Sequence, residues 1–98
     1  MSRAEEAARY MTADELYQLG TDFRHGTNGK PEMPTTAIKY LTIAGDRGHM
    51  EAQYSLGCMY ETGEGCIADI KEAVEWYDAA AYKGHDAAKE ALQKITGG

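Results

Sequence analysis

A motif that occurs twice in this chain, with a third copy begun, limits the possible folds more than any other sequence feature. Gly20 recurs as Gly57, 37 residues later, and Gly48 recurs as Gly84, 36 residues later. The first copy therefore carries one extra residue, within residues 27–33. Repeats of this length are typical of solenoids, in which each unit buries its apolar face against its neighbours. We therefore expect a short repeat array.

Each copy has the apolar spacing of two helices. In the second copy, apolar side chains recur every three or four residues from Ala52 to Tyr60 and again from Ile70 to Ala81. This is the period of an amphipathic helix. Glycines between the two runs can supply the positive φ angles that a turn between helices needs. The sequence predicts helices over residues 12–25, 34–47, 49–62, 69–83 and 86–95.

Three of these helices begin with recognisable start signals. Thr12 and Glu15 have the spacing of a capping box, in which each side chain bonds to the other's backbone N–H. Asp69 and Glu72 repeat that spacing with an acidic cap. Pro34 suits the first turn of a helix, where a backbone N–H has no partner to lose.

The motif also divides the chain into segments. Residues 1–11 are helix-prone but do not match the repeat, so we expect a capping helix or an arm there. The remaining segments are the first repeat at 12–48, the second repeat at 49–84, and a partial third repeat with a C-terminal tail at 85–98. The last predicted helix has no following helix to cover it, so weak self-association through that end is a hypothesis.

Charge and apolar pattern argue against several classes of partner. Sixteen acidic residues against ten basic ones give a net charge of −6, which disfavours nucleic acid because phosphate binding needs a basic face. No apolar run has the length of a membrane span or the features of a secretory signal. We therefore expect no membrane partner and a cytoplasmic protein. In that compartment Cys58 and Cys66 are expected to be free thiols.

The second copy resembles a Sel1-like repeat, as its sequence AQYSLGCMYETGEGCIADIKEAVEWYDAAAYKG indicates. It departs from the usual pattern at Cys66, where valine is usual, and at Glu72 and Ala79, where lysine is common. The residues that fall on pattern positions are Ala52, Leu56, Gly57, Tyr60, Gly63, Gly65, Asp69, Ala73, Trp76, Tyr77, Ala80, Ala81 and Gly84.

The first copy resembles the same family less closely. It departs from the pattern at Phe23, Asn28, Met33 and Gly45, yet the match still extends over residues 12–95. The resemblance implies an all-α fold, a right-handed α-α superhelix of tetratricopeptide-like helix pairs with about five to six helices. It also implies a role as an adaptor in multiprotein assemblies.

The resemblance further implies where a partner binds, because the first helix of each pair lines the concave side of such a superhelix. Tyr17 and Tyr54 occupy equivalent places there, and each is either a partner anchor or a cover for the neighbouring core. Acidic residues outnumber basic ones on this face, which favours a partner segment with Lys or Arg. The candidate positions are Asp14, Tyr17, Thr21, Arg24 and His25, then Glu51, Tyr54, Cys58, Glu61 and Thr62, and finally Glu90 and Lys94.

No residue pattern predicts a metal, a cofactor or catalysis. His25, His49 and His85 lack the spacing of metal ligands, and the last two each follow a repeat glycine, where a helix is expected to begin. No serine or cysteine stands in a known nucleophile motif. We therefore expect no metal, no cofactor and no enzyme activity.

Three functions follow from these observations, in decreasing order of support. The first is a protein-interaction module, an adaptor or regulator that binds a segment of a partner protein on its concave face. The second is an inhibitor or immunity-type antagonist of a basic enzyme. The third is a hydrolase of a small molecule related to the cell wall.

Overall fold

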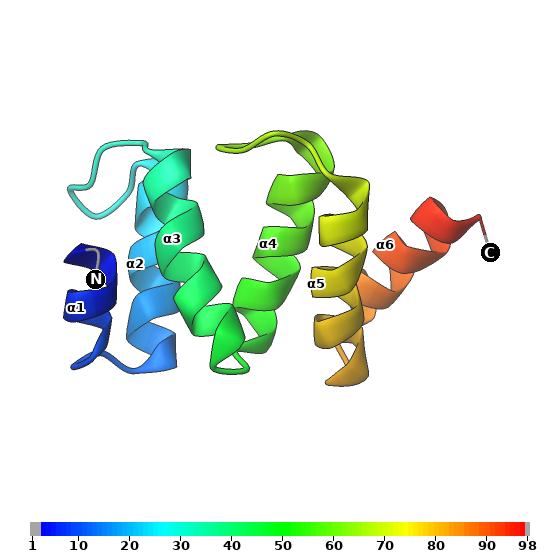
Figure 1. Cartoon of the computed structure of the whole chain (residues 1–98), viewed down its shortest axis with the longest axis horizontal. Coiled ribbons are helices and arrows are strands. Elements are labelled where there is room, and N and C mark those ends of the chain that lie inside the picture. The colour runs from blue at the N-terminus through cyan, green and yellow to red at the C-terminus, as the bar shows by residue number, and fades with distance from the viewer. Residues whose placement is uncertain (1–2, 98) are drawn as a thin grey trace.

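The computed structural model of the chain describes residues 3–97; residues 1, 2 and 98, which belong to the predicted end segments, lie outside this range. The described residues form six α-helices and no strand (Figure 1), so the predicted all-α class is confirmed. The helices predicted from the repeat are present, and their ends differ from the predicted ones by one residue at most. The helices are α1 (Arg3–Ala8), α2 (Ala13–His25), α3 (Pro34–Asp46), α4 (Met50–Thr62), α5 (Ile70–Tyr82) and α6 (Asp86–Thr96).

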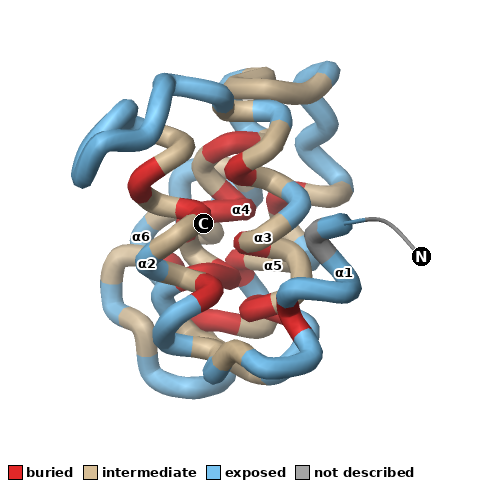
Figure 2. Tube along the Cα trace, turned by 90° about the vertical axis from the view of Figure 1, so that its left-hand side faces the viewer, coloured by how far each residue is buried: buried red, intermediate tan, exposed pale blue. Residues whose placement is uncertain are grey.

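The helices stack in chain order along the long axis of a body that measures 40 × 25 × 23 Å (Figure 1). Viewed along that axis, α2 and α6 lie to one side and α3 and α5 to the other, with buried residues between them (Figure 2). Each helix from α2 onward packs on the next, and α4 also contacts α6. The contact between α4 and α6 brings together the first helix of the second repeat and the first helix of the partial third repeat.

Close packing within each helix pair depends on the glycine of the repeated Leu-Gly. A Cβ atom at Gly20 would lie 2.7 Å from Leu41 Cγ, and one at Gly57 would lie 2.5 Å from two ring carbons of Tyr77. Carbon atoms prefer a separation of about 3.5–4.0 Å. Glycine at these two places therefore lets the side chains of α3 and α5 reach the core, where Leu41 and Tyr77 are buried.

The loops after α2 and α4 have left-handed backbone conformations, with positive φ, at equivalent positions. Gly26 and Gly63 begin them with φ of 68° and 79°. Two residues later, Gly65 has φ 75° and its counterpart Asn28 has φ 52°, the one positive φ outside glycine among residues 3–97. Asparagine tolerates this region better than most residues, so the degenerate first copy keeps the backbone of the second.

Asp22 organises the longer loop of the first repeat. Its Oδ1 accepts hydrogen bonds from Gln18 Nε2 at 3.0 Å, Thr27 Oγ1 at 2.8 Å and Asn28 Nδ2 at 2.9 Å. These bonds, that of Thr27 above all, lower the pKa of the Asp22 carboxyl because they favour its charged form. The extra residue in this loop is thus accommodated by a local polar network.

The predicted caps are confirmed by their hydrogen bonds. The Thr12 backbone N–H donates to Glu15 Oε1 at 2.8 Å, and the Glu15 N–H donates to Thr12 Oγ1 at 3.1 Å. Asp69 Oδ1 accepts from the Glu72 N–H at 3.1 Å. Pro34 stands in the first turn of α3 as expected.

Helix α1 packs at the open end of the first repeat and contacts α3. Arg47, at the end of α3, donates from its guanidinium to the carbonyl oxygens of Met11 at 2.6 Å and Ala8 at 2.8 Å. Ala8 is buried in the same core cluster as Leu16 and Leu41. The arginine therefore terminates α1 and fixes it on the first repeat.

Candidate functional site

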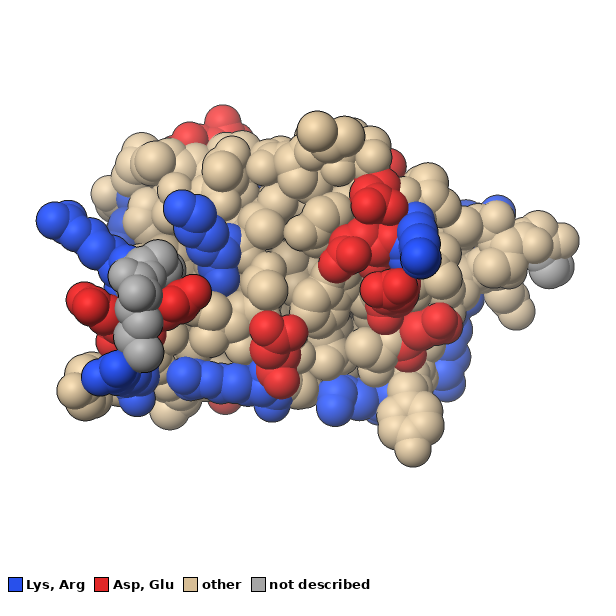
Figure 3. Space-filling model, viewed as in Figure 1, with Lys and Arg blue, Asp and Glu red and all other residues tan. Residues whose placement is uncertain are grey.

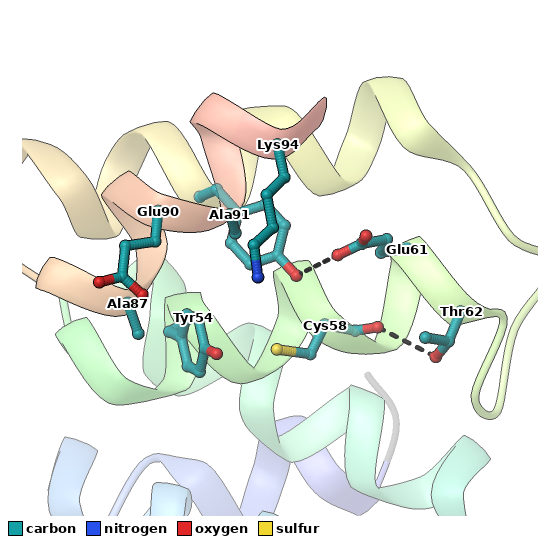
Figure 4. A pocket seen from close by; sticks show the side chains of 9 residues that line it. Tyr54, Cys58, Glu61, Thr62, Ala87, Glu90, Ala91 and Lys94 are labelled. Carbon is teal, nitrogen blue, oxygen red and sulfur yellow. Dashed lines mark hydrogen bonds between the residues drawn. The ribbon is translucent and has the colours of Figure 1, made fainter. Parts of the chain in front are cut away.

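A groove of about 300 Å³ opens between α4 and α6 (Figure 4). Side chains from α4 and α6 form its two walls, and Tyr77 of α5 reaches it from below. The lining mixes aromatic, acidic and small side chains with one thiol and one amine. The lining residues are Tyr54, Cys58, Glu61, Thr62, Tyr77, Ala87, Glu90, Ala91 and Lys94.

The base of the groove holds a strong hydrogen bond. The Tyr77 hydroxyl donates to Glu61 Oε1 at 2.6 Å, while the Tyr77 ring is buried against α4. Burial raises the pKa of Tyr77 most, and the neighbouring Cys58 and Glu61 raise it further. The hydroxyl therefore stays protonated, and it orients one carboxylate of the groove.

The rim of the groove carries three exposed charges. Glu61 projects from α4, and Glu90 and Lys94 project from successive turns of α6. Figure 4 shows the Lys94 side chain extending from α6 into the groove, between Glu90 and Glu61. Two carboxylates against one ammonium leave the groove with a negative balance.

Tyr54 connects this groove to the N-terminus of α6. Its ring stacks on the His85 ring with centroids 4.4 Å apart, and His85 Nε2 lies 3.1 Å from Glu51 Oε2. The first repeat has the same arrangement. Tyr17 stacks on His49 at 4.5 Å, and His49 Nε2 lies 2.8 Å from Asp14 Oδ1.

The geometry assigns the tautomer of both histidines. Nδ1 of His49 accepts from the Ala52 N–H, and Nδ1 of His85 accepts from the Ala88 N–H, each at 3.1 Å. Because an accepting nitrogen carries no proton, Nε2 is the N–H that faces the carboxylate. Each histidine is thus an N-cap, as its position after a repeat glycine predicted, and it also joins its helix to the first helix of the preceding repeat.

Arg24 makes the corresponding long-range contact on α2. Its Nε donates to Glu64 Oε2 at 2.9 Å and its NH2 group donates to Glu64 Oε1 at 3.0 Å, across 40 residues of sequence. The Arg24 side chain is 19% exposed. The bidentate bond to Glu64 raises the pKa of Arg24, although burial opposes this shift.

The structure thus separates the candidate residues into two sets. Of those on α2, Asp14, Tyr17 and Arg24 contact residues of the second repeat, while Thr21 is partly buried and His25 is exposed. Those brought together in the groove are Tyr54, Cys58, Glu61, Thr62, Glu90 and Lys94.

Three groove residues were absent from the candidates. Tyr77 was predicted as core, which is correct for its ring, but its hydroxyl reaches the groove. Ala87 and Ala91 lie one turn apart on α6, beside Glu90 and Lys94. Ala87 lies three residues before Glu90 and Ala91 lies three residues before Lys94, a usable signal, since residues three or four apart share a helix face.

Residues 3–97 contain neither a metal site nor a membrane-spanning helix. No group of three or more His, Cys, Asp or Glu side chains is placed to hold a metal ion, and Cys58 and Cys66 are free. No helix in this range has the length and apolarity to cross a membrane. The face formed by α3 and α5 carries acidic side chains gathered over α5 (Figure 3). Glu75 and Asp78 of α5 are exposed.

Comparison with known proteins gives consistent matches. The family model described as Sel1 repeat matches residues 6–49 and 51–85. The chain is 37% identical over 59 residues to DAP3-binding cell death enhancer 1 of Mus musculus, which covers 60% of this chain and 12% of that protein. It is 30% identical over 83 residues to the exopolysaccharide production negative regulator of Rhizobium leguminosarum bv. viciae, covering 82% and 31%.

A solved structure shows the same fold. The Sel1 repeat protein from Oxalobacter formigenes superposes with a TM-score of 0.83 and 26% sequence identity, over 96% of this chain and 41% of that chain. The chain therefore spans less than half the length of each of these three proteins.

Proposed function

This chain belongs to the Sel1 repeat family, and we propose that it is a protein-interaction module that binds a segment of a partner protein. The binding surface that we propose lies on the layer formed by the first helices of the repeats, α2, α4 and α6 (the first-helix layer), in the groove between α4 and α6. The observation that carries the proposal is the groove itself. It is open, it has about 300 Å³ of volume, and its aromatic and polar lining resembles the composition of peptide-binding surfaces.

The names of two relatives support a regulatory role through protein contact. One is described as a DAP3-binding enhancer of cell death and the other as a negative regulator of exopolysaccharide production. Those descriptions belong to much longer proteins. The part that this chain shares with them is the repeat region, so the shared property we carry over is the ability to contact another protein.

We further propose that the bound segment is basic. Glu61 and Glu90 face the groove against Lys94 alone, and the whole chain has a net charge of −6. Complementary charge steers a partner toward a surface and disfavours wrong partners more than it adds affinity. A basic segment is therefore selected over an acidic one.

Affinity capture with a variant whose groove is filled tests the proposal. Ala91→Trp places a large side chain in the lining, and Ala7→Trp makes the same change at an exposed position of α1 as the control. The full chain and both variants would be used as bait in extract of the source cell, with circular dichroism to check that each is folded. We expect the Ala7→Trp variant to retain the wild-type partner and Ala91→Trp to lose it.

Retention of the same partner by folded Ala91→Trp would place the binding surface elsewhere and contradict the proposal. If the captured partner has a measurable activity, its loss on binding would indicate an antagonist, whereas unchanged activity would indicate an adaptor.

A further inference from the structure

We propose that the groove between α4 and α6 takes one arginine side chain of the partner, held between Glu61 and Glu90 against the ring of Tyr54. This inference rests on the proposed function and specifies the group that the groove recognises. It is argued from a comparison within the molecule, because the preceding space between α2 and α4 already contains an arginine.

Arg24 shows how a guanidinium lies in this repeat. It projects from α2 on the same helix face as Tyr17, which is seven residues earlier. Its side chain is 81% buried in this position, as its 19% exposure implies, and Glu64, in the loop after α4, binds it through two parallel hydrogen bonds. A carboxylate of the second repeat thus binds a largely buried cation of the first.

The space between α4 and α6 has the corresponding positions with the charge reversed. Glu61 is the counterpart of Arg24, 37 residues later, and Tyr54 is the counterpart of Tyr17. On the facing helix, Glu90 stands 36 residues after Tyr54. The second space therefore lacks the internal guanidinium, offers carboxylates from both walls, and remains open with about 300 Å³.

The hydrogen-bonding state of Glu61 leaves it able to bind a guest. Its Oε1 accepts the Tyr77 hydroxyl, and none of residues 3–97 donates a hydrogen bond to its Oε2. The Tyr77 bond also holds the carboxylate in one orientation, which reduces the entropy lost when a guest binds. Glu61 is therefore a pre-oriented acceptor on the α4 wall of the groove.

Arginine fits these surroundings better than lysine. Its planar guanidinium has five N–H donors in a fixed fork, so it can bond to carboxylates on both walls at once. The same plane stacks on aromatic faces, and the groove supplies the partly buried ring of Tyr54. A lysine ammonium is a point charge, so it has neither the fixed fork of donors for two carboxylates nor a plane that stacks on an aromatic ring.

Lys94 opposes a cationic guest and provides a test of opposite sign. Its ammonium reaches into the groove (Figure 4), and the side chain is exposed, so it can swing away when a guest enters. Removing its charge should therefore tighten binding, whereas removing the charge of Glu61 or Glu90 should weaken it.

The experiment is a titration of the ¹⁵N-labelled full chain with N-acetyl-arginine amide, followed by backbone amide chemical shifts. N-acetyl-citrulline amide, which has nearly the same shape without the charge, is the comparison ligand. We expect saturable shifts near Glu61 on α4 and near Glu90 on α6, with a Kd on the order of millimolar for so small a ligand. Citrulline should give no saturable shifts.

Variants at the charged residues then assign the contacts. Glu61→Gln keeps an acceptor for Tyr77, and this variant and Glu90→Gln should each raise the Kd about fivefold. Lys94→Gln should lower the Kd about twofold. Glu75→Gln on the outer face of α5 removes the same charge at an exposed position outside the groove, and it should leave the Kd unchanged.

Three results would overturn the inference: equal shifts with citrulline, an equal effect of Glu75→Gln, or no saturable shifts with arginine. The capture experiment separates this failure from failure of the proposed function. If Ala91→Trp loses the partner while Glu61→Gln and Glu90→Gln both retain it at wild-type strength, the groove binds a partner but not through an arginine.

Discussion

The two halves of the first-helix layer share a backbone plan and differ in what fills them. Between α2 and α4, Arg24 reaches across and forms a bidentate ion pair with Glu64. Between α4 and α6, the position of Arg24 is taken by Glu61, which turns to the Tyr77 hydroxyl instead. One half thus holds an internal ion pair, and the other contains the groove of about 300 Å³.

This difference shows that a repeat position has no fixed role. Tyr17 and Tyr54 are equivalent and both stack on the histidine of the next repeat, but Tyr54 also lines the groove. The residues that face each tyrosine therefore determine whether its ring makes internal contacts alone or also lines the groove. Predictions that compare equivalent positions therefore test this account directly.

The largest expected effect concerns the two glycines beneath the second helices. Gly57→Ala should lower the free energy of unfolding by about 2 kcal/mol, because the new Cβ meets a rigid tyrosine ring that is tethered to Glu61. Gly20→Ala should lower it by about 1 kcal/mol, since the Leu41 side chain can move more easily. Urea unfolding followed by circular dichroism measures both values. Equal losses, or a stabilisation from the better helix propensity of alanine, would contradict the packing argument.

The second prediction concerns the histidine that joins the repeats. His49→Ala should lower the free energy of unfolding by about 1.5 kcal/mol, because it removes the cap on Ala52 and the stack on Tyr17. His49→Asn keeps a capping side chain without the stacked ring, so it should cost about half as much. Thermal or urea unfolding of the two variants gives the comparison. If they lose the same amount, the cap contributes nothing and the stacked ring alone accounts for the role of this histidine.

The smallest effect is expected at Gln53, the counterpart of the fully buried Leu16. Gln53 Nε2 donates to the Gly45 carbonyl at 3.0 Å, but its buried Oε1 has no partner among residues 3–97. The Gly45 oxygen keeps a second donor in the Gly48 N–H at 2.9 Å. Gln53→Leu should therefore leave stability unchanged or raise it by up to about 1 kcal/mol. A loss above about 1 kcal/mol in urea unfolding would show that the amide has a further role at the α3–α4 contact.

Local signals in the sequence were sufficient for the helices. The capping box at Thr12, the acidic cap at Asp69 and the glycines of the loops each act on backbone groups a few residues away, so spacing alone reveals them. The repeat then fixed the order of packing, because each unit contacts its neighbours in sequence. The fold could be predicted for these reasons.

The candidate site could be predicted only in part. Equivalence to a tetratricopeptide groove selected six of the residues that line the groove between α4 and α6, but it also selected Asp14, Tyr17 and Arg24, which make contacts within the molecule. The partners of those three side chains lie 32 to 40 residues away. A pattern that repeats every 36 residues cannot say which of two equivalent positions finds such a partner.

The sequence by itself determined the helix-pair repeat, its caps and turns, and the glycines that allow close packing, since these depend on local geometry and on the spacing of small and apolar residues. The tertiary structure alone decided which partner each long side chain of the first helices reaches, because those partners lie far away in the sequence. Arg24 ends on Glu64 across 40 residues. Glu61, at the equivalent position, ends on the hydroxyl of a tyrosine whose ring is buried in the core, at the groove between α4 and α6.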